Sequence, residues 1–229
     1  MTVLIDPRVS EACVRTLVSL GVSVKRLPLS SDLDRPVSGH PDLLTAKLPR
    51  GELLLTRRYY EANRAFFDGL GHPLCPTEEA LEPQYPRDVL FDALAVGDTL
   101  YGKEGTVSRV LRREYRHFVP VKQGYARCSV AMLSDRAAVT ADRGLADALR
   151  RSGVAVLDIR PGHIALPGYD YVFIGGAGGR LPDGTYVFFG DLTSHPDGEA
   201  ICRFAEEQKI SAVSLSDEPI CDHGGILCL

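Results

Sequence analysis

The apolar residues of this chain recur in a repeating order along its length. Five stretches place apolar residues at the spacing of amphipathic helices, and each is followed by a short apolar run typical of a strand. The predicted helices span Pro7 to Gly21, Arg57 to Leu70, Thr106 to Tyr115, Arg143 to Ser152 and Asp197 to Gln208. Their starts return at intervals of roughly 40 to 50 residues, a range in which self-similarity indicates a repeated structural unit.

A strand-like run also precedes each predicted helix and ends near a polar residue suited to capping it, as in Leu53 to Thr56 and Tyr186 to Phe189. Before four of these runs lies another short strand, so the repeated unit is strand, strand, helix, strand. The first unit lacks its opening strand, whereas the chain ends on a surplus one. We therefore expect Ile226 to Leu229 to pair beside Val3 to Ile5, closing a ring of units without free sheet edges.

This pattern predicts an α/β fold in a single domain, residues 1–229, built as a five-fold propeller whose terminal strands pair. The alternative is an open three-layer sheet with five helices. A doubly wound sheet would need mostly single strands between its helices, and this chain supplies two or three. The length of 229 residues, 45% of them hydrophobic, is sufficient for a substantial core.

Charge and cysteine content restrict the partners of the protein. The formal net charge is -4 and the sequence pI about 5.9, with Lys and Arg scattered among carboxylates, so a nucleic-acid partner is disfavoured. The six cysteines form no C-x-x-C pair and follow no signal peptide, which predicts reduced thiols and a cytoplasmic location. Apolar runs fall short of the roughly 20 residues of a membrane span.

Several short motifs add to the repeat. They are His40-Pro41-Asp42, Gln123 to Ser129, Phe173 to Gly179, Phe189-Gly190-Asp191 with His195-Pro196-Asp197, and the terminal D-x-G-G-x-x-C-L of residues 222–229. With them the chain resembles the pentein fold of guanidine-modifying enzymes, which include dimethylargininase, arginine deiminase and amidinotransferases. More closely, it resembles an uncharacterised bacterial family assigned to that fold. The resemblance spans nearly the whole chain and implies a pentein-like propeller.

The resemblance implies a Cys nucleophile on the first strand of the closing unit, and Cys228 matches that strand and the paired glycines before it. The histidine acid/base of those enzymes would fall near Tyr125 to Ser129, where Arg127 and Cys128 stand instead. Their E-G-G-D motif, which grips the substrate, has a loose counterpart in Ile174 to Ala177 without its carboxylates. The fold is therefore better supported than the chemistry.

Polar residues near the starts of four opening strands would converge on the axis of a five-fold ring. They are His40, Asp42, Asp88, Arg127, Cys128, Asp222, His223 and Cys228. In an enzyme, Cys228 would attack a guanidine or amidine carbon while His223 or His40 moves protons. Asp42 and Asp88 would orient the cation, and Arg127, Cys128 and Asp222 would complete the binding site. The alternatives are a structural Cys228 and a simple turn at His40.

Two further motifs have structural explanations. Gly175 to Gly179 precedes a turn and a strand rather than a helix, which predicts a hairpin instead of a phosphate cradle. His195-Pro196-Asp197 is typical of a helix start, with Ser194 or Asp197 as the cap. No His, Cys or carboxylate pair has metal-ligand spacing, so neither a metal nor a cofactor is expected.

The predicted function is the binding of a small guanidino, amidine or amide ligand in a polar central pocket. One alternative is a Cys-dependent hydrolase that acts on guanidine or amidine C–N bonds. The other is a non-catalytic binding scaffold, as the ribosomal anti-association factor shows this fold can be. The sequence decides neither whether the protein is an enzyme nor its oligomeric state.

Overall fold

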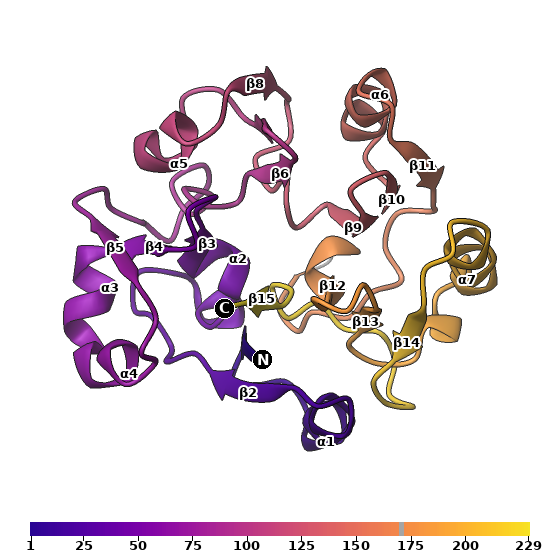
Figure 1. Cartoon of the computed structure of the whole chain (residues 1–229), viewed down its shortest axis with the longest axis horizontal. Coiled ribbons are helices and arrows are strands. Elements are labelled where there is room, and N and C mark those ends of the chain that lie inside the picture. The colour runs from indigo at the N-terminus through magenta and orange to yellow at the C-terminus, as the bar shows by residue number, and fades with distance from the viewer. Residues whose placement is uncertain (170–171) are drawn as a thin grey trace.

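The computed structural model describes residues 1–169 and 172–229, and within them five three-stranded sheets surround a common centre (Figure 1). In each sheet an opening strand pairs antiparallel with a middle strand, which pairs parallel with the third strand. The units comprise β15 (Leu227–Cys228), β1 (Thr2–Ile5) and β2 (Ser23–Arg26); β3 (Thr45–Lys47), β4 (Leu53–Thr56) and β5 (Leu74–Thr77); β6 (Leu94–Val96), β7 (Thr99–Gly102) and β8 (His117–Pro120); β9 (Val130–Ser134), β10 (Ala137–Thr140) and β11 (Ala155–Asp158); and β12 (Gly178–Arg180), β13 (Tyr186–Phe188) and β14 (Ala212–Ser214).

The helices that join middle and third strands lie on the outside of the ring (Figure 1). They are α1 (Glu11–Ser19), α3 (Arg57–Ala62), α4 (Arg64–Asp68), α5 (Arg109–Arg113), α6 (Arg143–Arg151) and α7 (Gly198–Glu207). The short 3-10 helix η3 (Leu192–Ser194) precedes α7, whereas η1 (Arg35–Val37) and η2 (Gly175–Ala177) lie in the segments that connect one unit to the next. In α6, Asp142 accepts a hydrogen bond from the Leu145 N–H at 2.8 Å and so caps the helix. The predicted second helix is divided at Asn63, and the predicted third helix is shorter than its pattern suggested.

The termini close the ring as predicted. Val3 pairs with Cys228 and Leu4 with Leu227 in an antiparallel ladder between β1 and β15. Both chain ends therefore lie near the centre of the molecule (Figure 1). The five-fold arrangement is confirmed, and the open three-layer sheet is wrong.

The middle strands are apolar because the ring buries both of their faces. All residues of β4, β10 and β13 are buried, which explains their continuous apolar runs in place of an alternating pattern. Leu4, Leu54 and Leu100 belong to one buried cluster, and Val139 and Phe188 belong to another. Each such side chain contributes about 1.5 to 3 kcal/mol through removal from water. The core therefore lies around the centre and fixes the segments that reach it.

Two local predictions need correction. His40 leads into a short helix, α2 (Pro41–Leu44), which occupies the first half of the opening strand expected over Leu43 to Ala46, so β3 begins only at Thr45. Pro41 suits the first helical position. At the start of α7, Asp197 does not cap the helix with its side chain, because its carboxylate binds the backbone and guanidinium of Arg160. The predicted glycine hairpin is confirmed, since β12 pairs antiparallel with β13.

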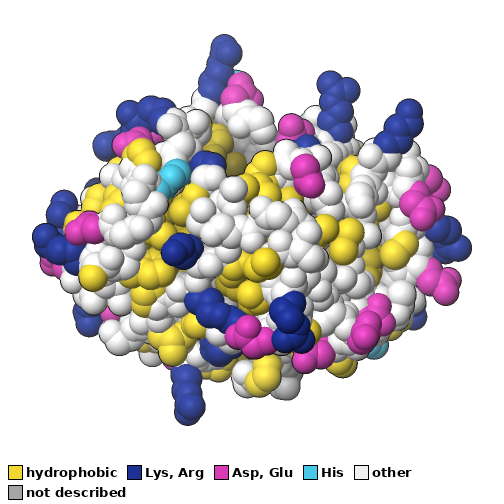
Figure 2. Space-filling view, turned by 60° about the horizontal axis from the view of Figure 1, so that its bottom comes forward, with side chains coloured by type: hydrophobic (Ala, Val, Ile, Leu, Met, Phe, Trp, Pro, Cys, Tyr) yellow, Lys and Arg dark blue, Asp and Glu magenta, His cyan; other side chains and the backbone are white. Residues whose placement is uncertain are grey.

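The outer surface carries charges of both signs. On the face shown in Figure 2, Lys and Arg side chains lie beside Asp and Glu side chains and do not form a large patch of one charge. None of the helices in the described part of the chain is long and apolar enough to cross a membrane. All six cysteines are free.

Candidate functional site

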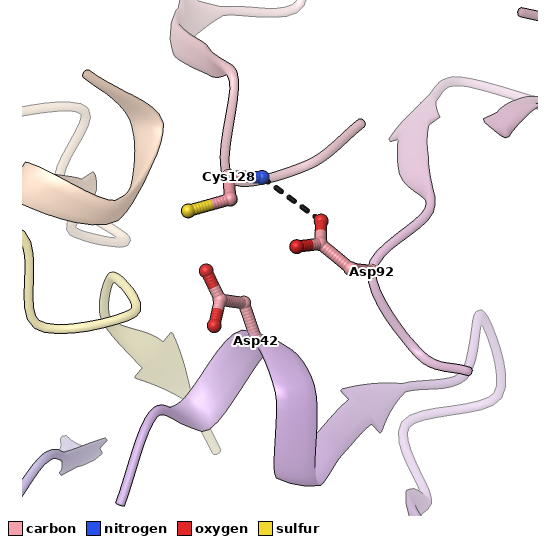
Figure 3. Close-up of side chains that lie close together, drawn as sticks. All are labelled: Asp42, Asp92 and Cys128. Atoms are coloured by element: carbon pink, nitrogen blue, oxygen red, sulfur yellow. Dashed lines mark hydrogen bonds between the residues drawn. The ribbon is translucent and has the colours of Figure 1, made fainter. Parts of the chain in front are cut away.

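Segments from four units bring acidic groups together at the centre of the ring. Asp42 extends from α2, Asp92 from the loop before β6, and Cys128 from the loop before β9, and the three side chains point toward one another (Figure 3). One carboxylate oxygen of each aspartate and the Cys128 sulfur lie within 4.8 Å of one another. We call these three residues the acidic cluster. Their exposed fractions are 1% for Asp42, 0% for Asp92 and 5% for Cys128.

Backbone N–H groups fix Asp92 in this cluster. Its Oδ1 accepts hydrogen bonds from the N–H groups of Arg127 at 2.7 Å and Cys128 at 2.9 Å. The other oxygen, Oδ2, and both carboxylate oxygens of Asp42 have no hydrogen-bond partner among the described residues. The cluster therefore presents three buried acceptor atoms whose interactions with water have not been replaced.

Asp222 extends the acidic cluster toward the terminal strand. Its Oδ2 lies 3.5 Å from the Cys128 sulfur, and its Oδ1 accepts the Gly224 N–H at 2.9 Å. A Cβ atom at residue 176 would stand 2.0 Å from Asp222 Oδ1, so only glycine allows this approach. Gly224 has a φ of +70°, and a Cβ there would meet the Cβ of His40 at 2.4 Å. These contacts explain two glycines of the sequence motifs.

His40 lies between two buried carboxylates. Its Nδ1 is 3.9 Å from Asp222 Oδ1, and its Nε2 is 4.0 Å from Asp6 Oδ2. Asp6 is itself held by the Arg8 side chain. A row of buried titratable groups therefore runs from Asp6 through His40 and Asp222 to Cys128.

Burial dominates the electrostatics of the cluster. It raises the pKa of the Cys128 thiol well above its ordinary value, and the nearby charges of Asp222, Asp42 and Asp92 raise it further. Burial, followed by the Asp42 charge, likewise raises the pKa of Asp92, and burial raises that of Asp222. The physical cause is that several acids share a buried space, where desolvation of their charged forms outweighs the opposing effects of Arg127 on Asp92 and of His40 on Asp222.

Two cavities meet at the acidic cluster. The larger has a volume of about 370 Å³, and its wall includes Asp42, Lys47, Arg127, Arg180 and Cys228. The smaller, of about 150 Å³, has a mostly apolar wall from which three polar groups project: His40, Cys128 and Asp222. Because Asp42 and Cys128 are neighbours, a ligand in either cavity reaches the acidic cluster.

The structure brings most of the predicted site residues together. His40, Asp42, Cys128 and Asp222 lie at the centre, and Arg127 lines the larger cavity, where its Nη1 donates to the Thr45 carbonyl at 3.2 Å. Asp88 is buried outside the cluster, where it accepts a hydrogen bond from the Tyr125 hydroxyl. The roles assigned to these residues stay predictions.

The two predicted catalytic residues contact different neighbours. Cys228 lines the larger cavity, and its sulfur lies 3.4 Å from the Arg180 carbonyl oxygen. His223 packs edge-on against Phe189, and burial lowers its pKa to about 4. No hydrogen bond links Cys228 to either His223 or His40 in the part of the chain that the structure describes. A catalytic role for the Cys228 and His223 pair stays a prediction.

Sequence reasoning missed Asp92 and Asp6. The sequence predicts Asp88 at the centre because it lies near the start of an opening strand, yet Asp92 is the carboxylate that reaches the centre. One signal was available, because Asp92 stands alone between apolar residues just before an opening strand. A charged residue in such a position is buried only where partners or a ligand compensate for its desolvation.

Comparisons with known proteins agree with the fold. The structure is similar to SxtG, an amidinotransferase from Microseira wollei in the saxitoxin biosynthetic pathway, with a TM-score of 0.56 and 13% identity over 93% of this chain and 77% of that one. It is also similar to a Cys-to-Ser mutant of DDAH from Pseudomonas aeruginosa complexed with citrulline, with a TM-score of 0.53 and 11% identity over 94% and 92% of the two chains. These likenesses establish the pentein fold.

At the level of sequence, no curated protein matches the chain. One family profile, by contrast, matches almost all of it, from residue 4 to residue 227. The chain, which has the pentein fold, therefore belongs to the family of unknown function DUF6873.

Proposed function

We propose that the centre of the ring binds a small organic cation that carries a guanidino or amidine group. The observation that carries this proposal is the state of Asp42. Its carboxylate is 1% exposed, lines the cavity of about 370 Å³, and has no hydrogen-bond partner for either oxygen among the described residues. Asp92, whose Oδ2 also lacks a partner among the described residues, lies beside Asp42 in the acidic cluster.

The chemistry of the carboxylates favours such a ligand. A buried ionised carboxylate is strongly destabilised unless a cation and hydrogen-bond donors compensate for its lost hydration. A guanidinium or amidinium group supplies both, since its planar N–H groups match carboxylate oxygens in pairs. Asp42 and Asp92 together would hold one such group, and the remaining cavity would accept its substituent.

The similar structures support this choice of ligand at the level of the fold. One is an amidinotransferase and the other was solved with citrulline. In the present chain the two central carboxylates come from the units that contain β3 and β6, so the ligand would sit between neighbouring opening segments. The assignment to this chain rests on Asp42 and Asp92, whose buried oxygens without hydrogen-bond partners lie close together.

Cys228 favours a second candidate function, a hydrolase acting on the same ligand. It lines the cavity that also contains Asp42. Its thiolate would add to the guanidino or amidine carbon, the C–N bond would break, and the amine would leave with a proton. Water would then cleave the carbon–sulfur bond and restore the thiol. Burial raises the pKa of Cys228, and Lys47 and Arg127 lower it, so a bound cation would favour the thiolate further.

Calorimetric titration tests the binding proposal. Agmatine, arginine and benzamidine carry the required group, whereas citrulline and benzamide are neutral controls of similar shape. We expect at least one cation to bind more tightly than its neutral counterpart, and Asp42→Asn to weaken it by about 10- to 100-fold through loss of a charged hydrogen bond. Asp32→Asn, which changes a buried carboxylate outside the site, is the matched control. Equal binding of cations and neutral analogues would overturn the proposal.

Hydrolysis is tested with the same compounds. Release of amine or ammonia that is lost in Cys228→Ala, with cation binding retained, would establish the enzyme. Binding without turnover in the unmodified protein leaves the binding scaffold as the function.

A further inference from the structure

The acidic cluster contains one group that an organic cation does not require. The Cys128 sulfur lies beside Asp42 and Asp92, with one ligand atom of each residue within 4.8 Å of the others. All three side chains are at most 5% exposed. A guanidinium group would bind the two carboxylates and not the thiol. A thiophilic metal ion would bind all three groups.

We propose that Asp42, Asp92 and Cys128 form a binding site for a thiophilic divalent metal ion, best matched by Zn²⁺, and that this ion and the organic cation exclude each other. The metal site stands on the geometry of the acidic cluster alone. Only the competition rests on the proposed function, because both cations would use Asp42 and Asp92.

The free acceptor atoms point to a ligand at this position. Three carboxylate oxygens, two on Asp42 and one on Asp92, have no hydrogen-bond partner among the described residues. The fourth, Asp92 Oδ1, is fixed by the N–H groups of Arg127 and Cys128. Such outer hydrogen bonds orient a ligating carboxylate and leave its second oxygen for the metal. An exposed acidic cluster would satisfy all of these oxygens with water.

The donor set selects among metals. Zn²⁺ binds thiolate sulfur at about 2.3 Å and carboxylate oxygen at about 2.0 to 2.2 Å, usually with four ligands. Side-chain rotations of Asp42 and Cys128 would bring the present spacing to that geometry. Mg²⁺ and Ca²⁺ prefer sites made of oxygen alone, so the sulfur disfavours them. Water, or Asp222 at 3.5 Å from the Cys128 sulfur, would complete the coordination.

The charges balance when the metal binds. Cys128 gives up its proton to solvent as the sulfur–metal bond forms, so two carboxylates and one thiolate face a divalent ion. The Arg127 guanidinium, whose charge acts on Asp92, compensates for the remaining negative charge. Linear spacing along the sequence gives no sign of this site, because its members are separated by 50 and 36 residues and come from three units.

Titration with Zn²⁺ in competition with a chromogenic chelator tests the site. We expect one tight site per chain, and a loss of more than about 100-fold in affinity in Cys128→Ser, since loss of a direct ligand exceeds the effect of outer-shell changes. Cys202→Ser removes a half-buried thiol elsewhere and is the matched control. Unchanged Zn²⁺ affinity in Cys128→Ser contradicts the proposal.

Co²⁺ provides a readout that does not depend on a folded variant. In the unmodified protein, it should show the near-ultraviolet absorption of a cobalt–thiolate bond and the intense visible bands of a four-coordinate ion. Added Zn²⁺ should displace it. A bound Co²⁺ without the thiolate absorption contradicts a site that includes Cys128.

The two proposals fail separately. Cys128→Ser should lose the metal, whereas Asp42→Asn should lose both the metal and the organic cation. Saturating agmatine or benzamidine, whichever binds, should lower the apparent Zn²⁺ affinity at least tenfold. Zn²⁺ binding without any organic cation would overturn only the proposed function, and cation binding without Zn²⁺ would overturn only the metal site. Simultaneous binding of both would overturn the competition.

Discussion

Cys128 and Cys228 illustrate two different ways in which a residue can mark a site. Cys228 occupies the position that the resemblance to guanidine-modifying enzymes selects, yet among the described residues its thiol forms a hydrogen bond only with the Arg180 backbone carbonyl. Cys128 occupies a position where the resemblance places a histidine, yet it stands among three buried carboxylates. Both cysteines border the central cavities.

The difference lies in the charges that surround the two thiols. The Cys128 sulfur is surrounded by Asp222, Asp42 and Asp92, so its charged form requires an additional cation. Cys228 is influenced by Lys47 and Arg127, which favour its charged form against the effect of burial. Position in the fold therefore suggests a nucleophile at Cys228, whereas local chemistry suggests a cation ligand at Cys128.

The largest expected effect comes from adding one methyl group beside the acidic cluster. In Gly176→Ala the new Cβ would stand 2.0 Å from Asp222 Oδ1, so Asp222 and the segment that carries it must move. We expect the free energy of unfolding to fall by about 3 kcal/mol or more, at the upper end of overpacking effects. Denaturant titration measures the change.

Gly144→Ala is the control for that substitution. Gly144 lies in α6, where the added Cβ meets only Asp142 Oδ1 at 3.3 Å and alanine favours the helix. Its effect should stay within about 1 kcal/mol of zero. If Gly176→Ala behaves like this control, Asp222 is not tightly held, and the described cluster is looser than its geometry implies.

An intermediate effect should come from His223, the predicted acid/base partner of Cys228. Burial lowers its pKa to about 4, whereas the unfolded chain binds the proton near the ordinary value of 6.5. Its contribution to stability is therefore complete above pH 6.5 and is lost as the pH falls toward 4. We expect a loss of about 2 to 3 kcal/mol across this window.

Comparison of variants isolates this contribution, because other groups titrate in the same range. The stability of His223→Gln should depend less on pH between 6.5 and 4 than that of the unmodified protein. His117→Gln changes an exposed histidine and should leave the dependence unchanged. Identical pH profiles for His223→Gln and the unmodified protein would show that His223 is accessible to solvent and available as an acid.

The surroundings of Cys228 and of Cys128 also show how much of the structure could be predicted from the sequence. The fold was predictable because the strand, strand, helix, strand order repeats and because the chain ends on the strand that its beginning lacks. Cys228 could be located from the paired glycines before it. These features are local or periodic, and the order of apolar and polar residues records them directly.

The acidic cluster was less predictable because it depends on loop conformations and side-chain directions. Asp88 and Asp92 are four residues apart in the sequence, but only Asp92 belongs to the acidic cluster at the centre. His40 and Asp42 were expected at the head of a strand, and helix α2 places them instead in the central space. The periodic pattern of apolar residues does not predict which of two nearby carboxylates points toward the centre of the ring, because packing between units determines the side-chain direction.

The smallest expected effect concerns the reactivity of Cys228. Burial raises the pKa of the Cys228 thiol, and the charge of Lys47, more than that of Arg127, lowers it, so Lys47→Ala should raise this pKa further and reduce the thiolate fraction. Alkylation by iodoacetamide at pH 8 should slow by about two- to fivefold, as expected for one partly screened charge. Mass spectrometry of the Cys228 peptide measures the rate, with Cys202 in the same sample as the reference. An unchanged rate would mean that Lys47 does not act on the sulfur, and Arg127 would then be the only cation favouring a Cys228 nucleophile.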